Sequence, residues 1–300
     1  MPYNLQNKLV VAVSSRALFN LETENKIFEE KGLQAYYEYQ LENEEKPLEK
    51  GTGYRLIENL LKINNYFTKE QKQVEVIVLS KNNAATSLRI TNAIKNYGLD
   101  IERSGWTSGR DLSHYLKAFK VDLFLSADDK DVTNAINNGV AAAKILSCDA
   151  PVSSSHGEQV RIAFDGDAVL FSAESEKVYQ KEGLEAFIEH EKRNKDNPLQ
   201  KGPFANLLLT IAALQAKFPD ENSPIRTALV TARSAPTHER VIKTLNVWGV
   251  RIDEAFFLGG SEKYEILEAF GADIFFDDQD THLELSKSVV PSAKVIHSLD

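Results

Sequence analysis

An internal repeat constrains this chain more than any other feature of its sequence. When the 300 residues are compared with themselves at an offset of 151, Gly32 aligns with Gly183 and Pro47 with Pro198. An offset of this size far exceeds the roughly 20 to 50 residues of solenoid repeats. The sequence therefore predicts two copies of one domain, 1–152 and 153–300, divided at the polar stretch 153–157. Further pairs at this offset are Ala84 with Ala235, Arg89 with Arg240, Gly98 with Gly249, Gly109 with Gly260, and Asp122 with Asp273.

Each copy alternates apolar runs with segments of helical periodicity. In the second copy, we expect strands at 160–164, 227–230, 255–258 and 274–276, and helices at 237–248 and 262–270. The near-continuous apolar runs predict strands that are buried on both faces. This alternation predicts a doubly wound, Rossmann-like parallel sheet in each copy, and such sheets bind ligands beyond the carboxyl ends of their strands.

Composition excludes several classes of protein. A net charge of −9 and 26% charged residues lie near the globular average, which argues against a disordered or collagen-like chain. The acidic balance disfavours nucleic acid as a partner, and no window of about 18 apolar residues predicts a membrane span. The single cysteine, Cys148, cannot form an internal disulfide, and no long apolar run opens the chain. We therefore expect a cytoplasmic protein.

Reactive side chains follow the expected strands of the second copy. Asp165 and Asp167 follow the first strand, Thr231 the second, Lys263 the third, and Asp277-Asp278 the fourth. This set suits phosphoryl transfer, in which one carboxylate attacks phosphorus and Mg²⁺ offsets the repulsion between the two anions. A second carboxylate, two residues on, can protonate the leaving oxygen, while a hydroxyl and an ammonium hold the phosphate oxygens.

The D-x-D pattern is weak evidence when taken alone. It also occurs at 129–131 and 278–280, where a solvated turn explains it equally well. Only the pattern at 165–167 directly follows a five-residue apolar strand and precedes another apolar run. Its position in the same copy as the other strand-end motifs favours a functional interpretation.

The order of these motifs is similar to that of the haloacid dehalogenase superfamily. The longer strings RIAFDGDAVLFS, ALVTARSAPTHERVIKTL, WGVRIDEAFFLGG and DIFFDDQ resemble the cytosolic 5'-nucleotidase I family, and VAVSSRALF, QLENEEKPL and VDLFLSADDKDV extend this resemblance over nearly the whole chain. It implies tandem haloacid dehalogenase-type domains with a helical cap insertion. It also implies Mg²⁺-dependent hydrolysis of nucleoside 5'-monophosphates, AMP foremost, through an aspartyl-phosphate intermediate.

The resemblance also implies roles for individual residues. Asp165 would be the nucleophile, Asp167 the acid and base, and Thr231 and Lys263 phosphate contacts. The magnesium ligands would be Asp165, the main-chain carbonyl of Asp167, Asp277 and Asp278. One departure is Ala173, where the family commonly has an acid after Phe-Ser; Ser172 could take over its role at the start of the following helix, so the change bears on affinity or specificity.

Substrate contacts beyond the phosphate are expected from four residues and from a cap at about 172–226, which is too long for one crossover helix. A core position, a surface ion pair or an exposed helix position are the alternatives for these residues. The candidates are Phe171 as a stacking partner for a purine, Ser172 beside it, Arg233 for phosphate or ribose, and His190 within the cap.

The first copy lacks nearly all the reactive acids. Ser14-Ser15-Arg16 stands at the first strand end, Ser80 at the second, and Ser126-Ala127 at the fourth. We therefore predict that 1–152 is catalytically inactive. Two alternatives to a 5'-nucleotidase stay open: a phosphatase of the same superfamily acting on another small phosphate ester, and a nucleotide-binding regulatory module without turnover. The sequence also leaves the oligomeric state open, a homo-oligomer included.

Overall fold

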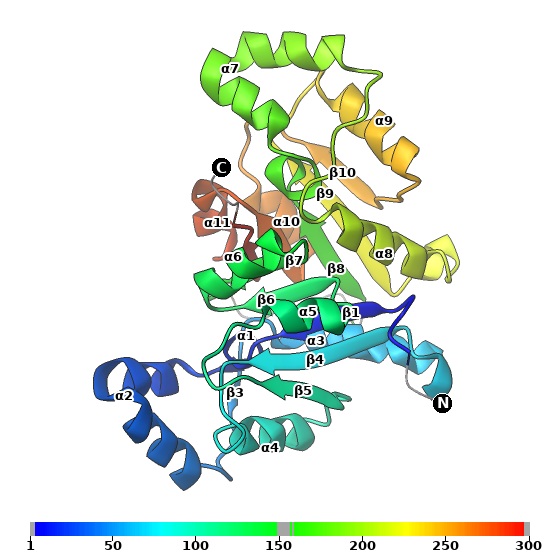
Figure 1. Ribbon diagram of the computed structural model, residues 1–300. Coiled ribbons are helices and arrows are strands. Elements are labelled where there is room, and N and C mark those ends of the chain that lie inside the picture. Colours follow the sequence, from blue (N-terminus) through cyan, green and yellow to red (C-terminus); the bar gives the residue numbers. More distant parts are fainter. Residues whose placement is uncertain (1–3, 149–156, 158, 297–300) are drawn as a thin grey trace. The chain divides into compact units, whose positions relative to one another are not determined.

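The computed structural model describes residues 4–148, 157 and 159–296, which form two compact units (Figure 1). Unit 1 is Met1–Val140 and unit 2 is Ala141–Asp300. The predicted division at 153–157 lies, except for Gly157, outside the described residues. The units divide earlier, at 140, because β7 (Ala141–Ile145) pairs antiparallel with β12 (Ser292–Lys294) of unit 2. The assignment of 1–152 as inactive and 153–300 as catalytic stays a prediction.

Unit 1 contains a parallel sheet with the strand order β5-β4-β1-β6. The register of the central pair aligns Leu9 with Val74 and Val13 with Val78, and both strands are fully buried. A short antiparallel pair, β2 and β3, lies apart from this sheet. The strands are β1 (Leu9–Val13), β2 (Phe19–Asn20), β3 (Glu49–Lys50), β4 (Val74–Ser80), β5 (Arg103–Trp106) and β6 (Leu123–Ser126), and the helices are α1 (Ser15–Leu18), α2 (Glu22–Glu42), α3 (Tyr54–Lys62), α4 (Leu88–Asn96), α5 (Ser113–Ala118) and α6 (Asp129–Asn137).

Unit 2 repeats this strand order in its parallel strands, β10-β9-β8-β11, and continues with β12 and β7. Phe164 aligns with Leu229 of β9 on one side and with Phe276 of β11 on the other, so β8 is central. The core of this sheet is apolar and includes Ala163, Val230 and Phe275. The remaining elements are β8 (Val160–Phe164), β9 (Ile225–Thr231), β10 (Glu254–Phe257), β11 (Ile274–Asp277), α7 (Glu174–Arg193), α8 (Ala205–Gln215), α9 (His238–Trp248), α10 (Tyr264–Phe270) and α11 (Asp280–Ser286).

The two long helices of the repeat bend at equivalent glycines. Gly32 in α2 has φ 81° and ψ −178°, and Gly183 in α7 has φ 83° and ψ −177°. Only glycine adopts this backbone region without strain. Each helix therefore consists of two arms at an angle, which Figure 1 shows for both.

These observations confirm the prediction of an α/β protein with mostly parallel sheets, and the strands expected at 160–164, 227–230 and 274–276 are present. One expectation was wrong: β10 is only half-buried, because it lies at the edge of its sheet and pairs, among the described residues, with β9 alone. The haloacid dehalogenase type and the cap at 172–226 stay predictions. No helix in the described part of the chain has the length and apolar character needed to cross a bilayer.

Candidate active site

Three reactive residues lie at the carboxyl ends of neighbouring strands in unit 2. Asp165 directly follows β8, Thr231 ends β9, and Asp277 ends β11. Because β8 pairs in parallel with both β9 and β11, these ends meet at one edge of the sheet. Each of the three residues is at most 4% exposed. The structure thus gathers buried polar groups at the place where the sequence analysis expected a site.

Lys263 joins two of these strand ends. Its Nζ donates hydrogen bonds of 2.7 Å to Oδ1 of Asp165 and of 2.7 Å to Oδ2 of Asp277. Lys263 precedes α10 and is only 2% exposed. The turn before it contains Gly259 (φ 59°) and Gly260 (φ 89°), whose left-handed backbone favours glycine. The ammonium of Lys263 is thus paired with carboxylates, as buried charges in proteins usually are.

Burial and neighbouring charge act in opposite directions on the two carboxylates. Burial raises the pKa of Asp165 from 3.8 to about 7, and the charge of Asp277 adds to this increase while Lys263 opposes it. Burial would also raise the pKa of Asp277, but Lys263, His282 and the Gln279 backbone N–H outweigh it and lower that pKa. Nδ1 of His282 lies 3.2 Å from Oδ2 of Asp277. The partners of Asp277 thus outweigh its burial, whereas those of Asp165 do not.

The donor set at this edge fits a hard divalent cation. Asp165, Asp277 and Asp278 each offer an oxygen, and these atoms all lie within 4.8 Å of one another. Carboxylate oxygens are the ligands that Mg²⁺ prefers. A divalent ion here would also offset the cost of burying two acids. The side chains of the three predicted ligands are thus together.

Asp167 has a different partner. Its two carboxylate oxygens accept hydrogen bonds from Nε and NH2 of Arg233, at 2.7 and 2.6 Å, which form a bidentate pair. Asp167 lies in a tight turn in which Ala168 has φ 63°, an uncommon value for a residue with a Cβ. Arg233 is 4% exposed, so the pair is a buried contact within the candidate site and not a surface ion pair.

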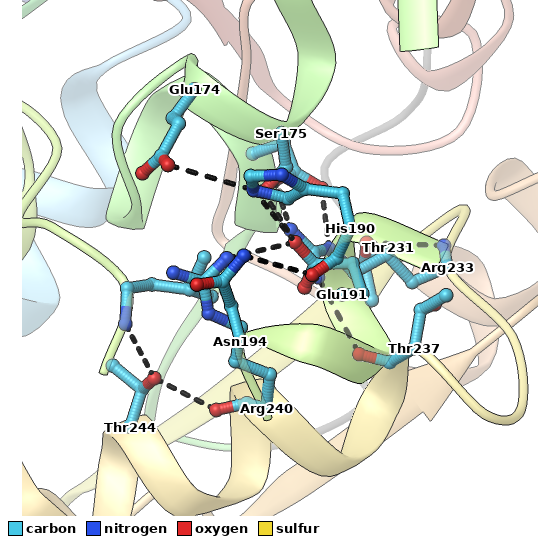
Figure 2. A network of polar contacts seen from close by, with 12 residues as sticks. Glu174, Ser175, His190, Glu191, Asn194, Thr231, Arg233, Thr237, Arg240 and Thr244 are labelled. Atoms are coloured by element: carbon cyan, nitrogen blue, oxygen red, sulfur yellow. Dashed lines mark hydrogen bonds and ion pairs between the residues drawn. The ribbon is translucent and has the colours of Figure 1, made fainter. Parts of the chain in front are cut away.

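Arg233 also belongs to a buried cluster around Glu191 of α7 (Figure 2). NH1 of Arg233 donates to Oε2 of Glu191, while Oε1 accepts from NH1 of Arg240 at 2.9 Å and from Oγ of Ser175 at 2.8 Å. Burial would raise the pKa of Glu191, but Arg233, Ser175 and Arg240 together lower it. The cluster therefore holds Glu191 as a carboxylate and ties α7 to the loop after β9.

The other three residues predicted to contact substrate have the following neighbours in the structure. Phe171 is fully buried and packs against Trp248, with ring centroids 5.6 Å apart, so this structure places it in the core, which a base cannot reach without rearrangement. Ser172 is partly buried, and its Oγ has no hydrogen-bond partner among the described residues. His190 lies on α7 with Nε2 3.5 Å from Oε1 of Glu174.

Unit 1 has hydroxyls and a lysine at the corresponding edge. Oγ of Ser15 lies 2.9 Å from Oγ of Ser80, and Ser126 stands at the position of Asp277. Nζ of Lys81 lies 2.6 Å from Oδ1 of Asp131. Among the described residues of unit 1, no cluster of three acids like that of unit 2 lies at this edge.

Sequence reasoning missed His282 in this site and Arg240 in the structural cluster beside it. For Arg240 there was a signal, because the repeat aligns it with Arg89 and a charged residue kept in both copies is unusual. His282 carried none, since it occupies an ordinary helix position.

The whole chain, residues 1–300, matches the family described as 5'-nucleotidase, and it belongs to that family. This confirms the resemblance that the motifs indicated. The chain is 40% identical over 292 residues to human cytosolic 5'-nucleotidase 1B, an alignment that covers 94% of this chain and 48% of the relative. The chain thus spans about half the length of that curated relative. No solved structure matches it.

Proposed function

We propose that unit 2 hydrolyses nucleoside 5'-monophosphates, AMP foremost, to nucleoside and phosphate with Mg²⁺ as its cofactor. The single observation that supports this most is the cluster of Asp165, Lys263 and Asp277 at adjoining strand ends of a chain in the 5'-nucleotidase family. The relative's printed name, cytosolic 5'-nucleotidase 1B, supports the same reaction and a cytoplasmic location.

Asp165, Asp277 and Asp278 would hold the magnesium ion, with the main-chain carbonyl of Asp167 as a further ligand. Bound Mg²⁺ supplies charge neutralisation between the carboxylates and the phosphate dianion. This is a requirement here, because three acids close together would otherwise repel the substrate.

In the proposed reaction, an oxygen of Asp165 forms a bond to phosphorus while the bond from phosphorus to the ester oxygen breaks. Asp167 donates a proton to that oxygen, which leaves as the nucleoside hydroxyl, and phosphate stays on Asp165. Asp167 then takes a proton from water, whose oxygen bonds to phosphorus and releases Asp165. Thr231 and Lys263 hold the phosphate oxygens.

Helix α7 is proposed as the cap, which limits the helical lid to 174–193, because α8 is an apolar helix whose side chains are largely buried. Unit 1 is proposed to be catalytically inactive, since Ser14 and Ser126 stand at the positions of Asp165 and Asp277 there. A serine hydroxyl is neutral, so at either position it lacks the negative charge that a carboxylate ligand provides for Mg²⁺.

Phosphate release by the purified full chain tests this function. AMP, other nucleoside monophosphates and sugar phosphates are compared with Mg²⁺ and then with EDTA, beside the Asp165→Asn variant. We expect turnover of AMP that EDTA and the substitution both abolish. Preference for sugar phosphates would indicate another phosphatase, and no turnover of any ester would indicate a nucleotide-binding module.

A further inference from the structure

Among the described residues, only Arg233 contacts both Asp167 and the kinked helix α7 through charged hydrogen bonds. Its Nε and NH2 donate to Asp167, and its NH1 donates to Glu191 and, at 3.4 Å, to the carbonyl of Thr237. The guanidinium carbon also lies 5.3 Å from the ring centre of Phe187 on α7. Arginine presents its donors in a rigid plane, so a bidentate pair fixes the orientation of a carboxylate as well as its position.

Comparison of the two units shows which contacts of this cluster serve the fold. In unit 1, Nε of Arg89 donates to the carbonyl of Lys46 at 3.1 Å, as Nε of Arg240 donates to the carbonyl of Asn197 at 2.8 Å. Arg89 also pairs with Glu24 at 2.6 Å. An arginine at this position is therefore kept in the unit that lacks the reactive acids, and it serves the fold.

Arg233 has no such counterpart. The equivalent residue of unit 1 is Asn82, whose Nδ2 donates to the hydroxyl of Tyr36 at 2.9 Å. Tyr36 stands at the position of Phe187, and no carboxylate stands at the position of Asp167. A neutral side chain at this position is thus compatible with the fold. The positive charge of Arg233 occurs in the unit that also has Asp167, its hydrogen-bond partner.

We propose that Arg233 is a positioning residue, which orients the carboxylate of Asp167 for proton transfer and makes that orientation depend on α7 through Glu191. This inference rests on the proposed function, in which Asp167 serves as acid and base. When α7 is in its present position, Glu191 accepts a hydrogen bond from NH1 of Arg233, while Nε and NH2 hold the Asp167 carboxylate in the plane of the guanidinium. When Glu191 withdraws, Asp167 loses this restraint.

Arg240 provides a matched control, because it also pairs with buried Glu191 but does not contact Asp167. We expect Arg233→Met and Arg240→Met to lower the thermal unfolding midpoint by similar amounts. Only Arg233→Met should lower kcat for AMP, by about a hundredfold with little change in KM, since misplacing a catalytic group by about 1 Å costs that much. Arg233→Lys should restore part of kcat, because an ammonium keeps the charge but not the fork.

A triple variant guards against loss of folding. Arg233→Asn with Phe187→Tyr and Glu191→Gln reproduces the neutral contact of unit 1, where Gln40 stands at the position of Glu191, and removes a buried anion together with the cation. This variant should fold, yet turn over AMP as slowly as Arg233→Met. Equal losses of kcat in Arg233→Met and Arg240→Met, or full activity of the triple variant, would overturn the proposal.

Failure of the proposed function would be visible separately, as a wild-type protein that does not hydrolyse AMP. In that case, a crystal structure of Arg233→Met tests the positioning role of Arg233 without an activity measurement. We expect the Asp167 carboxylate to turn away from its present orientation, and an unchanged Asp167 would refute the positioning role.

Discussion

Replacing Asp165 with asparagine is expected to stabilise the metal-free protein, increasingly so as the pH rises. Burial raises the pKa of Asp165 from 3.8 to about 7. Between these values the unfolded chain has released the proton that the folded protein still holds, so the free energy of unfolding of the wild type decreases with pH. At about 1.4 kcal/mol per pH unit, the full decrease is about 4 kcal/mol above pH 7. Asparagine has no proton to lose and avoids it.

Urea unfolding with EDTA, at pH values from about 4 to about 8, measures this effect. Near pH 4 both side chains are neutral and of similar shape, so the two proteins should be nearly equally stable. The difference should then grow to about 4 kcal/mol in favour of Asp165→Asn by about pH 8. Glu182→Gln, at a solvent-exposed position, serves as the control without such growth. A difference that stays constant with pH, or a variant less stable than wild type at pH 8, would refute the reasoning.

Three further predictions concern packing and surface charge. Gly202→Ala should lower the free energy of unfolding by about 3 kcal/mol, because its Cβ would lie 2.4 Å from the backbone oxygen of Phe171; Gly105→Ala, which meets only the end of a leucine side chain, should cost clearly less in the same urea titration. Phe171→Ala should cost about 3 to 5 kcal/mol by chemical denaturation, as expected of a fully buried ring, and an unchanged stability would contradict its place in the core. Arg226→Glu combined with Glu254→Arg reverses a 2.7 Å ion pair into the orientation that Glu75 and Arg103 have in unit 1. The double change should alter the free energy of unfolding by less than about 1 kcal/mol, whereas either single change, which places two like charges together, should cost more.

Strand ends were the predictable part of the site. Asp165 and Asp277 follow short apolar runs, and parallel strands must place their carboxyl ends at one edge, so their proximity needed no knowledge of side-chain contacts. Lys263 followed a glycine pair and could be placed at the same edge by similar reasoning.

The contacts of Arg233 were not predictable in this way. Asp167 lies 66 residues before it, and no periodicity reports a pair so distant in sequence. The burial of Phe171 was not predictable either, because the turn at Ala168, with its positive φ, redirects the chain immediately after the motif. Half-exposed β10 shows a further limit, since an apolar sequence does not reveal that a strand lies at the edge of its sheet.

The buried cluster balances its charges in two different ways, and this restricts how one arrangement can evolve into the other. In unit 2 two cations, Arg233 and Arg240, face two anions, Asp167 and Glu191, whereas in unit 1 the single cation faces one anion, at a different position. A single substitution that adds or removes one of these charges leaves an uncompensated charge in the interior, at a cost of about 3 to 5 kcal/mol. Building the charge arrangement of unit 2 into unit 1 would therefore require paired substitutions made together, because each single charge change lowers stability until its partner is added.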